Sequence, residues 1–422
     1  MNHAINPFNL FTSFLENPMA SLINGSLSDA THPPAKDTGG IYLHVPFCLK
    51  KCEYCDFFSI SDLSRIPDFV QAALLEIHLI SSPFSFDSLY FGGGTPSLLP
   101  LEGLDTIIGA LFKSFNISKN PEITLEANPK TIFPSTLTGY RAAGINRIQL
   151  GVQSFRDDHL AFLGRLHSSL EAKTGLHEIR KAGFDNLGLD LIYGLPGQSA
   201  EDWIQDMKEA LVFEPEHLSC YLLTYESGTP LEKNLRSGKF QALSEESSAN
   251  LFEVTREFLQ SNGYFQYEIS NFAKIEQNQK AVDPTLTHRS RHNQKYWRFD
   301  PYLGLGPSAH SYAPPMRSWN VRNLDQYLET LAKGLLPVEG QEVLTQTQEM
   351  TEAVALGLRT AEGVDISWFN HKFKVSFHDL FKAPLEALVQ NSLVLLTPNH
   401  LRLSPKGLVL HNSITELLIQ CF

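Results

Sequence analysis

The chain has 422 residues, of which 42% are hydrophobic and 19% are charged, which is enough for two or three globular domains. Its formal net charge of -12 argues against nucleic acid as a partner, because nucleic-acid binders usually present a basic face. No apolar run approaches the roughly 20 residues that span a bilayer, so we expect no membrane span, although transient contact with a membrane surface stays open.

Residues 1–39 are predicted to form a poorly ordered N-terminal extension. They are rich in Ser, Asn and Pro, and their apolar positions are scattered. They lack the basic start and the continuous apolar stretch of a secretory signal. A short helix that docks on the main body is the alternative interpretation.

Residues 40–230 contain six short apolar runs with the character of buried parallel strands. These runs are 41–47, 88–91, 122–127, 147–152, 186–192 and 217–223. Helical patterns occupy most of the intervals, at 69–80, 101–115, 170–182 and 200–212. Strand and helix in alternation predict an α/β fold with a parallel sheet and outer helices, either open or curled into a barrel.

After residue 230 this alternation stops. A helix is predicted at 245–260, and an aromatic, Gly-rich segment runs from 292 to 312. We expect residues 231–340 to cap the sheet. Residues 341–422 contain a predicted helix at 346–359 and strand-like runs at 393–396 and 401–403, which predict a C-terminal α+β accessory domain.

Three of the five cysteines form one motif. Cys48, Cys52 and Cys55 follow the first predicted strand at the spacing C-x3-C-x2-C, whereas Cys220 and Cys421 lie far away and are predicted to be packing or surface cysteines. An odd count without a secretory signal indicates ligands in a reducing cytoplasm and not disulfides. Thiolates suit iron–sulfur clusters, and three of them leave the fourth iron of a cubane open for a substrate. Zinc is the less favoured alternative, because it usually takes four protein ligands, or three and a water.

Polar residues and glycines lie at the carboxyl ends of the following strands, where parallel α/β folds bind their ligands. Glycines allow close backbone approach, and the loop after the second strand contains Gly93, Gly94 and Thr95. Glu126 ends the third strand, Gln153 ends the fourth, and Asp190 lies in the fifth. A buried polar group without a partner costs several kcal/mol, so three of them at one edge indicate a binding site.

At the cysteine motif the chain resembles the radical S-adenosylmethionine superfamily. The resemblance, and not the strand spacing, implies a partial (β/α)6 barrel. In this superfamily the open iron binds the amino and carboxyl groups of S-adenosylmethionine. The resemblance therefore implies a 4Fe-4S cluster on Cys48, Cys52 and Cys55 with S-adenosylmethionine beside it.

Within the superfamily the chain is most similar, over about residues 40 to 415, to the oxygen-independent coproporphyrinogen III oxidase family. The positions that match cofactor contacts of that family are Tyr42, Tyr54, Gly93, Gly94, Thr95, Glu126, Gln153, Arg165, Asp190 and Thr224. The resemblance implies that the glutamate binds ribose hydroxyls. It also implies that the arginine and its polar neighbours hold the methionine carboxylate and the sugar.

One position departs from the oxidases in this family. Their motif continues to a fourth cysteine, C-x3-C-x2-C-x-C, where this chain has Phe57. The sequence Cys-Asp-Phe resembles the sister group, the HemW heme chaperones. The long N-terminal arm of the oxidases is also replaced by about 40 unrelated residues.

A second segment resembles the same group. His292, Asn293, Tyr296 and Trp297 match the motif H-N-x-x-Y-W, which the resemblance connects with heme binding. An imidazole can ligate heme iron, and aromatic rings can pack on a porphyrin. The alternative is a hydrogen-bonded structural corner. The other candidate heme ligands are His288 and His310.

The resemblance implies a cytoplasmic heme chaperone that carries a 4Fe-4S cluster and S-adenosylmethionine and passes heme to an acceptor protein. It also implies a flavodoxin- or ferredoxin-type electron donor. The alternative is an enzyme that converts coproporphyrinogen III to protoporphyrinogen IX by radical chemistry.

Overall fold

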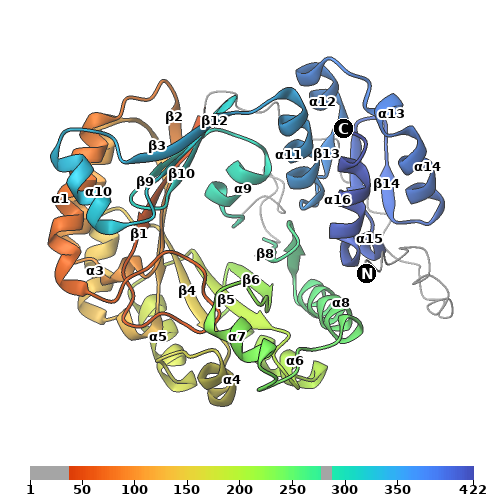
Figure 1. Cartoon of the computed structure of the whole chain (residues 1–422). Coiled ribbons are helices and arrows are strands. Elements are labelled where there is room, and N and C mark those ends of the chain that lie inside the picture. The colour runs from red at the N-terminus through yellow and green to blue at the C-terminus, as the bar shows by residue number, and fades with distance from the viewer. Residues whose placement is uncertain (1–37, 277–287) are drawn as a thin grey trace.

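The computed structural model describes residues 38–276 and 288–422, and its centre is a curved sheet (Figure 1). The sheet has the strand order β12-β11-β10-β9-β1-β2-β3-β4-β5-β6-β8-β7. Six neighbouring strands run parallel: β1 (Thr38–Val45), β2 (Ser85–Gly93), β3 (Asn116–Ala127), β4 (Arg147–Gln153), β5 (Leu187–Tyr193) and β6 (His217–Leu222). They confirm the prediction of a partial (β/α)6 barrel. The predicted N-terminal extension lies outside the described residues except for its last two, which begin β1.

Helices cover the outer face of the parallel strands (Figure 1). Their bounds are α1 (Ile66–Leu79), α2 (Leu101–Ser114), α3 (Pro134–Ala142), α4 (Asp157–Phe162), α5 (Ser169–Lys181) and α6 (Ala200–Leu211). The predictions for the longer helices are confirmed. Ser199 caps α6 and accepts a hydrogen bond from the backbone nitrogen of Asp202. Neither α3 nor α4 was predicted, because nine and six residues show too little helical period.

The parallel strands are buried on both faces. Every residue of β4 is buried, and so are Leu125 and Leu189 on the neighbouring strands and Leu43 on β1. Burial of one such leucine stabilises the fold by about 1.5–3 kcal/mol. Unbroken apolar runs are typical of a parallel sheet between two layers, which is why these strands were recognisable from the sequence.

Residues 231–340 extend the sheet at both edges. Next to β6 lie β8 (Asn271–Lys274) and β7 (Tyr264–Gln266), and next to β1 lie β9 (Tyr302–Leu305), β10 (His310–Ala313), β11 (Met316–Asn320) and β12 (Val338–Val343). The helices of this region are α7 (Pro230–Arg236), α8 (Glu245–Ser261), α9 (Arg291–Trp297) and α10 (Leu324–Ala332). Helix α9 lies between the sheet, where it contacts β1 and β2, and the C-terminal module (Figure 1).

The C-terminal module has its own core and its own sheet, as predicted for an α+β domain. Its elements are α11 (Gln346–Leu358), β13 (Val364–Asp365), α12 (Ile366–Phe373), α13 (Phe377–Leu380), α14 (Lys382–Gln390), β14 (Val394–Leu396), β15 (His400–Leu403), α15 (Pro405–Val409) and α16 (His411–Ile419). Arg359 joins the module to the main sheet through an ion pair with the buried Glu268. Among the described residues no helix is both long and apolar enough to cross a membrane.

A buried carboxylate ties the β9–β11 edge to helix α1. Glu76 accepts hydrogen bonds from the backbone nitrogen of Gly306 (2.8 Å), from Asn320 Nδ2 (2.6 Å) and from Tyr327 Oη (2.7 Å). Burial raises the pKa of Glu76 from 4.5 to about 7, against these three donors, which lower it.

This raised pKa predicts that the free energy of unfolding depends on pH. Between pH 4.5 and 7 the folded protein holds a proton on Glu76 that the unfolded chain releases, so its contribution to stability falls as pH rises through that window. We expect the free energy of unfolding of Glu76→Gln, relative to the unsubstituted chain, to rise over the same window in urea titrations. Gln71→Ala, at an exposed position of α1, is the control. A difference that does not change with pH would contradict the prediction.

Candidate functional site

The cysteine loop is fastened at its base and at its tip. At the base the backbone nitrogen of Cys48 donates to the Ile60 carbonyl (2.9 Å), and the Ile60 nitrogen donates to the Pro46 carbonyl (2.7 Å). At the tip the Glu53 carbonyl accepts from the backbone nitrogen of Leu231 (2.9 Å). These bonds hold the loop over the carboxyl end of β1.

Two of the three thiols have hydrogen-bond donors on the loops beside them. Thr95 Oγ1 donates to Cys48 Sγ (3.6 Å), and Arg165 Nη1 donates to Cys52 Sγ (3.5 Å). Burial raises the pKa of the Cys55 thiol, so cluster binding at that position must displace a proton. Donors that face the sulfur atoms are the surroundings that thiolate ligands require.

Two carboxylates lie on β3 and β5, on either side of β4. Glu126 accepts from Tyr90 Oη (2.7 Å) and from the Gly93 nitrogen (3.2 Å), and Asp190 accepts from Gln149 Nε2 (2.7 Å). Burial, and then the negative charge of Asp190, raise the pKa of Glu126 to about 7, and burial also raises the pKa of Asp190. Two buried carboxyl groups with raised pKa values suit a ligand that brings hydrogen-bond donors or positive charge.

The end of β4 is irregular at the same site. Gln153 adopts a φ of 69°, and the pairing of β4 with β5 shifts register between Gly151 and Gln153. Positive φ values in non-glycine residues and strand bulges both concentrate at functional sites. Arg165 fixes this bend because its Nη2 donates to the Gly151 carbonyl (2.7 Å).

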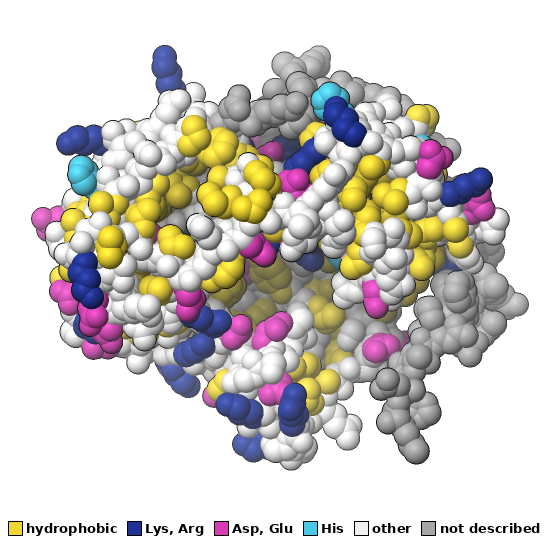
Figure 2. All heavy atoms as spheres, turned by 45° about the horizontal axis from the view of Figure 1, so that its top comes forward, with side chains coloured by type: hydrophobic (Ala, Val, Ile, Leu, Met, Phe, Trp, Pro, Cys, Tyr) yellow, Lys and Arg dark blue, Asp and Glu magenta, His cyan; other side chains and the backbone are white. Residues whose placement is uncertain are grey.

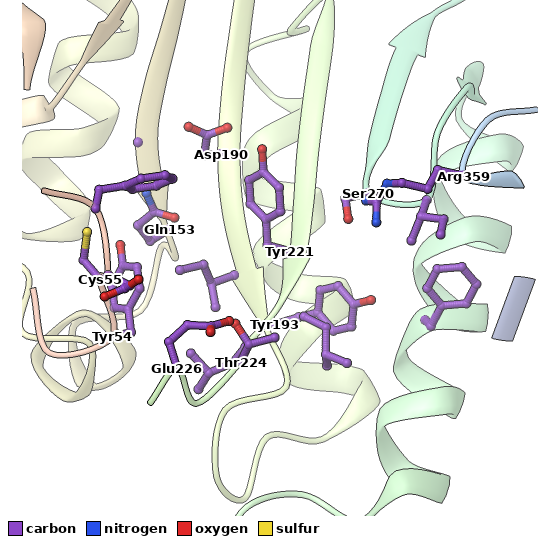
Figure 3. Close-up of a pocket in the computed structure, with 18 of the residues that line it drawn as sticks. Tyr54, Cys55, Gln153, Asp190, Tyr193, Tyr221, Thr224, Glu226, Ser270 and Arg359 are labelled. Carbon is purple, nitrogen blue, oxygen red and sulfur yellow. The ribbon is translucent and has the colours of Figure 1, made fainter. Parts of the chain in front are cut away.

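A single cleft joins these groups. Figure 3 shows Tyr54 and Cys55 at one end, Gln153, Asp190 and Tyr221 along the strand ends, and Ser270 and Arg359 at the far end. The cleft has a volume of about 2690 Å³. The predicted cluster and cofactor residues that line it are Tyr42, Cys48, Cys52, Tyr54, Cys55, Gly93, Gly94, Thr95, Glu126, Gln153, Arg165, Asp190 and Thr224. Figure 2 shows the protein surface hollowed near its centre, with hydrophobic side chains beside the hollow.

The segment predicted to bind heme reaches this cleft through Tyr296 alone of its four residues. His292 is 1% exposed, and its ring nitrogens contact Ser88 Oγ (3.1 Å) and Tyr296 Oη (2.9 Å). Burial lowers the pKa of His292 to about 3. Asn293 donates its backbone nitrogen to the helix cap at Ser290, and Trp297 packs against a tyrosine ring outside the cleft. This arrangement runs against the expectation that His292 ligates heme, because the ring packs between the sheet and α9.

Other residues of the cleft were not singled out from the sequence. Tyr221 is exposed at the end of β6, where the cleft opens. In the sequence it continues the apolar run 217–223, so no local signal singles it out. Arg322 and Arg359 come from distant segments, and no local pattern indicates that they face the site.

The residues present fit a cluster with S-adenosylmethionine beside it. Arg165 Nε is buried without a partner among the described residues, and it lies in the residue that also contacts Cys52. A Cβ atom at Gly94 would lie 2.5 Å from the Phe47 carbonyl oxygen, so a glycine is needed for this loop to pass under the cysteine loop. In the described ranges no three acidic, His or Cys side chains gather around a single metal ion, and a cubane held at three separate corners requires no such gathering.

Comparison with known proteins agrees with this geometry. Residues 42–210 match the Radical SAM superfamily, and residues 344–410 match the HemN C-terminal domain. The heme chaperone HemW of Lactococcus lactis is 31% identical over 378 residues, which cover 89% of this chain and 96% of the relative. The heme chaperone HemW of Synechocystis is 37% identical over 336 residues, which cover 76% of this chain and 78% of the relative. The chain belongs to the HemW family of radical SAM proteins.

The fold of this HemW family member is also found in a solved structure. Coproporphyrinogen III oxidase (HemN) from Escherichia coli matches it with a TM-score of 0.77 and 23% identity, over 91% of this chain and 90% of that chain. This likeness concerns the fold. Membership of the radical SAM superfamily implies a 4Fe-4S cluster and S-adenosylmethionine, which the cleft residues fit.

The cluster assignment can be tested by removing one thiol. We expect Cys52→Ala to lose the brown absorption of the anaerobically reconstituted protein, because one iron then has no protein ligand. Cys220→Ala is the matched control, because Cys220 is buried in β6 away from the cysteine loop. Optical spectra and iron content provide the measurement. Undiminished absorption in Cys52→Ala would rule out this cluster site.

Proposed function

We propose that the chain is a heme chaperone that binds heme in the cleft and transfers it to an acceptor protein. A 4Fe-4S cluster on Cys48, Cys52 and Cys55 and a bound S-adenosylmethionine are its resident cofactors. The observation that carries the proposal is that the cysteine loop opens into a cleft much larger than one cofactor needs. The relatives named as heme chaperones cover most of this chain.

The size of the cleft leaves room for a second ligand. Its volume of about 2690 Å³ exceeds the roughly 300–1,000 Å³ of a pocket for one small molecule. Tyr296, Tyr302, Phe57 and Phe58 line it outside the group of cofactor residues, and flat aromatic rings pack well on a porphyrin.

In this proposal the strand ends hold S-adenosylmethionine. The residues proposed to contact it are Tyr42, Tyr54, Gly93, Gly94, Thr95, Glu126, Gln153, Arg165, Asp190 and Thr224. Glu126 accepts hydrogen bonds from the ribose hydroxyls, and the guanidinium of Arg165 pairs with the methionine carboxylate. When bound, the cluster supplies one electron to the sulfonium of S-adenosylmethionine.

Phe57 favours a chaperone over an oxidase. It occupies the position where the oxidases have a fourth cysteine, and its side chain is 66% exposed on the lining of the cleft. An exposed aromatic ring there offers a face for porphyrin packing and no thiol. The fold likeness to the Escherichia coli oxidase keeps coproporphyrinogen III oxidation as the second candidate function.

The proposal includes two protein partners. Lys50 and Lys51 are exposed on the cysteine loop, and their charge suits an acidic electron donor of the flavodoxin or ferredoxin type. The heme acceptor is the second partner. All five cysteines are unpaired, which fits the reducing cytoplasm in which we place the protein.

The two candidate functions predict different products. We expect the anaerobically reconstituted protein to bind heme in a one-to-one ratio and to pass it to an apo heme protein. With reductant, S-adenosylmethionine and coproporphyrinogen III, we expect no protoporphyrinogen. Heme binding is followed in the Soret region, and porphyrins are measured by chromatography.

The Escherichia coli oxidase HemN is the positive control for the porphyrinogen assay. Accumulation of protoporphyrinogen with this chain would overturn the chaperone proposal in favour of the oxidase. Absence of stoichiometric heme binding would overturn it as well.

A further inference from the structure

The histidines of the cleft differ in whether a ring nitrogen is free. His44, His310 and His411 line the cleft. His44 Nε2 donates to the Phe58 carbonyl (2.8 Å), and its Nδ1 accepts from Tyr42 Oη (3.0 Å). Both ring nitrogens of His411 also have partners, at 3.1 and 3.5 Å.

His310 alone of these three has an exposed ring without a hydrogen bond to any described residue. The two other histidines near the predicted heme segment do not compete with it. His292 is buried with both nitrogens in contact, and His288 Nε2 is paired with Glu276 (2.8 Å) away from the cleft lining.

We propose that His310 is the protein ligand to the heme iron and that Arg322 holds a heme propionate. The inference rests on the proposed heme-binding function and assigns its ligand to a residue outside the H-N-x-x-Y-W motif. A neutral imidazole is a common axial ligand for heme iron. A guanidinium suits a carboxylate because its planar donors match the two oxygen atoms.

The imidazole is held in place by its neighbours. Strand β10 pairs with β11 so that His310 lies directly opposite Trp319, and the two rings stack with centroids 6.1 Å apart and planes 28° apart. Behind Trp319, a Cβ atom at Gly340 would come within 2.4 Å of the indole, so the glycine leaves room for the indole on β12. Gly304 on β9 leaves room for the backbone of β10, because a Cβ atom added there would lie 2.1 Å from the His310 carbonyl oxygen.

Arg322 lies near the same end of the β10–β11 pair. The backbone nitrogen of Ser308 donates to the carbonyl of Val321 (3.0 Å), which places Arg322 close to the start of β10. Its guanidinium donates to the Asp56 carbonyl (2.6 Å) on the cysteine loop, and it also lies 3.5 Å from Asp56 Oδ1. Because both side chains of this ion pair are more than half exposed, a propionate competes only with a solvent-exposed carboxylate.

The surroundings of His310 favour the neutral imidazole, which is the form that binds a metal. Partial burial, and then the charge of Arg317, lower the pKa of His310, so the neutral ring is the dominant form at neutral pH. Only a deprotonated ring nitrogen has the lone pair that binds iron.

The test uses the full chain with its cluster reconstituted and ferric heme as the probe. We expect His310→Ala to weaken heme binding by at least about tenfold and to shift the Soret band. Imidazole added to His310→Gly should restore the band of the unsubstituted chain, which a merely structural role would not allow. We expect Arg322→Gln to weaken binding several-fold without moving the band.

His378→Ala is the matched control, because His378 is exposed on α13 in the C-terminal module. It should bind heme like the unsubstituted chain, and all variants should keep the cluster absorption. An unchanged band and affinity in His310→Ala would overturn the assignment while the heme-chaperone function stands. Failure of the unsubstituted chain to bind heme would overturn both. An equal loss in His378→Ala would show that the effect is not specific to the site and would also refute the assignment.

Discussion

The site depends on one buried guanidinium that joins the sheet to the cysteine loop. Arg165 donates to the Gly151 carbonyl at the end of β4 and to Cys52 Sγ on the loop. A buried cation is costly unless it is paired, and Arg165 forms no ion pair with a carboxylate among the described residues. The Gly151 carbonyl oxygen (2.7 Å) and Cys52 Sγ (3.5 Å) are the acceptors of its hydrogen bonds, and a thiolate or a ligand carboxylate would stabilise the cation further. The side chain of Arg165 thus links the end of β4, the cysteine loop and the proposed cofactor site.

The opposite wall of the same site carries acidic groups, which complement the positive charge of Arg165. Glu126 and Asp190 are buried close enough for one charge to raise the pKa of the other carboxyl group. Their neutral partners, Tyr90 and Gln149, supply hydrogen bonds but no positive charge. A cation at Arg165 and carboxyl groups with raised pKa values on the other wall suit a zwitterionic, positively charged cofactor better than either wall alone would. The raised pKa values of Glu126 and Asp190 are consistent with positions where a positively charged cofactor would be stabilised.

The sequence predicted the parts of the fold that depend on local pattern. Unbroken apolar runs marked the six parallel strands, and the polar residues that interrupt them, such as Glu126 and Asp190, marked the edge where the cleft opens. The strands of residues 231–343 were not predicted, because β7 to β10 contain only three or four residues each and β9 pairs with β1 across more than 250 residues of chain. The H-N-x-x-Y-W segment shows a related limit. A motif gives residue types, but only the placement of α9 determines that Tyr296 faces the cleft and that His292 does not.

The two walls of the cleft differ in how they are held. The cofactor wall is built from the carboxyl ends of parallel strands, whose pairing and buried faces fix them directly. The wall of β9 to β11 is added at the edge of β1, where β9 pairs in parallel with β1 and β10 and β11 follow antiparallel. Glu76 on α1 also holds this wall, because it binds Gly306 and Asn320 from outside. Asn320 in turn donates its backbone nitrogen to the Ala309 carbonyl (2.9 Å), the residue before His310. The buried carboxylate on α1 thereby positions the strand that carries the proposed heme ligand.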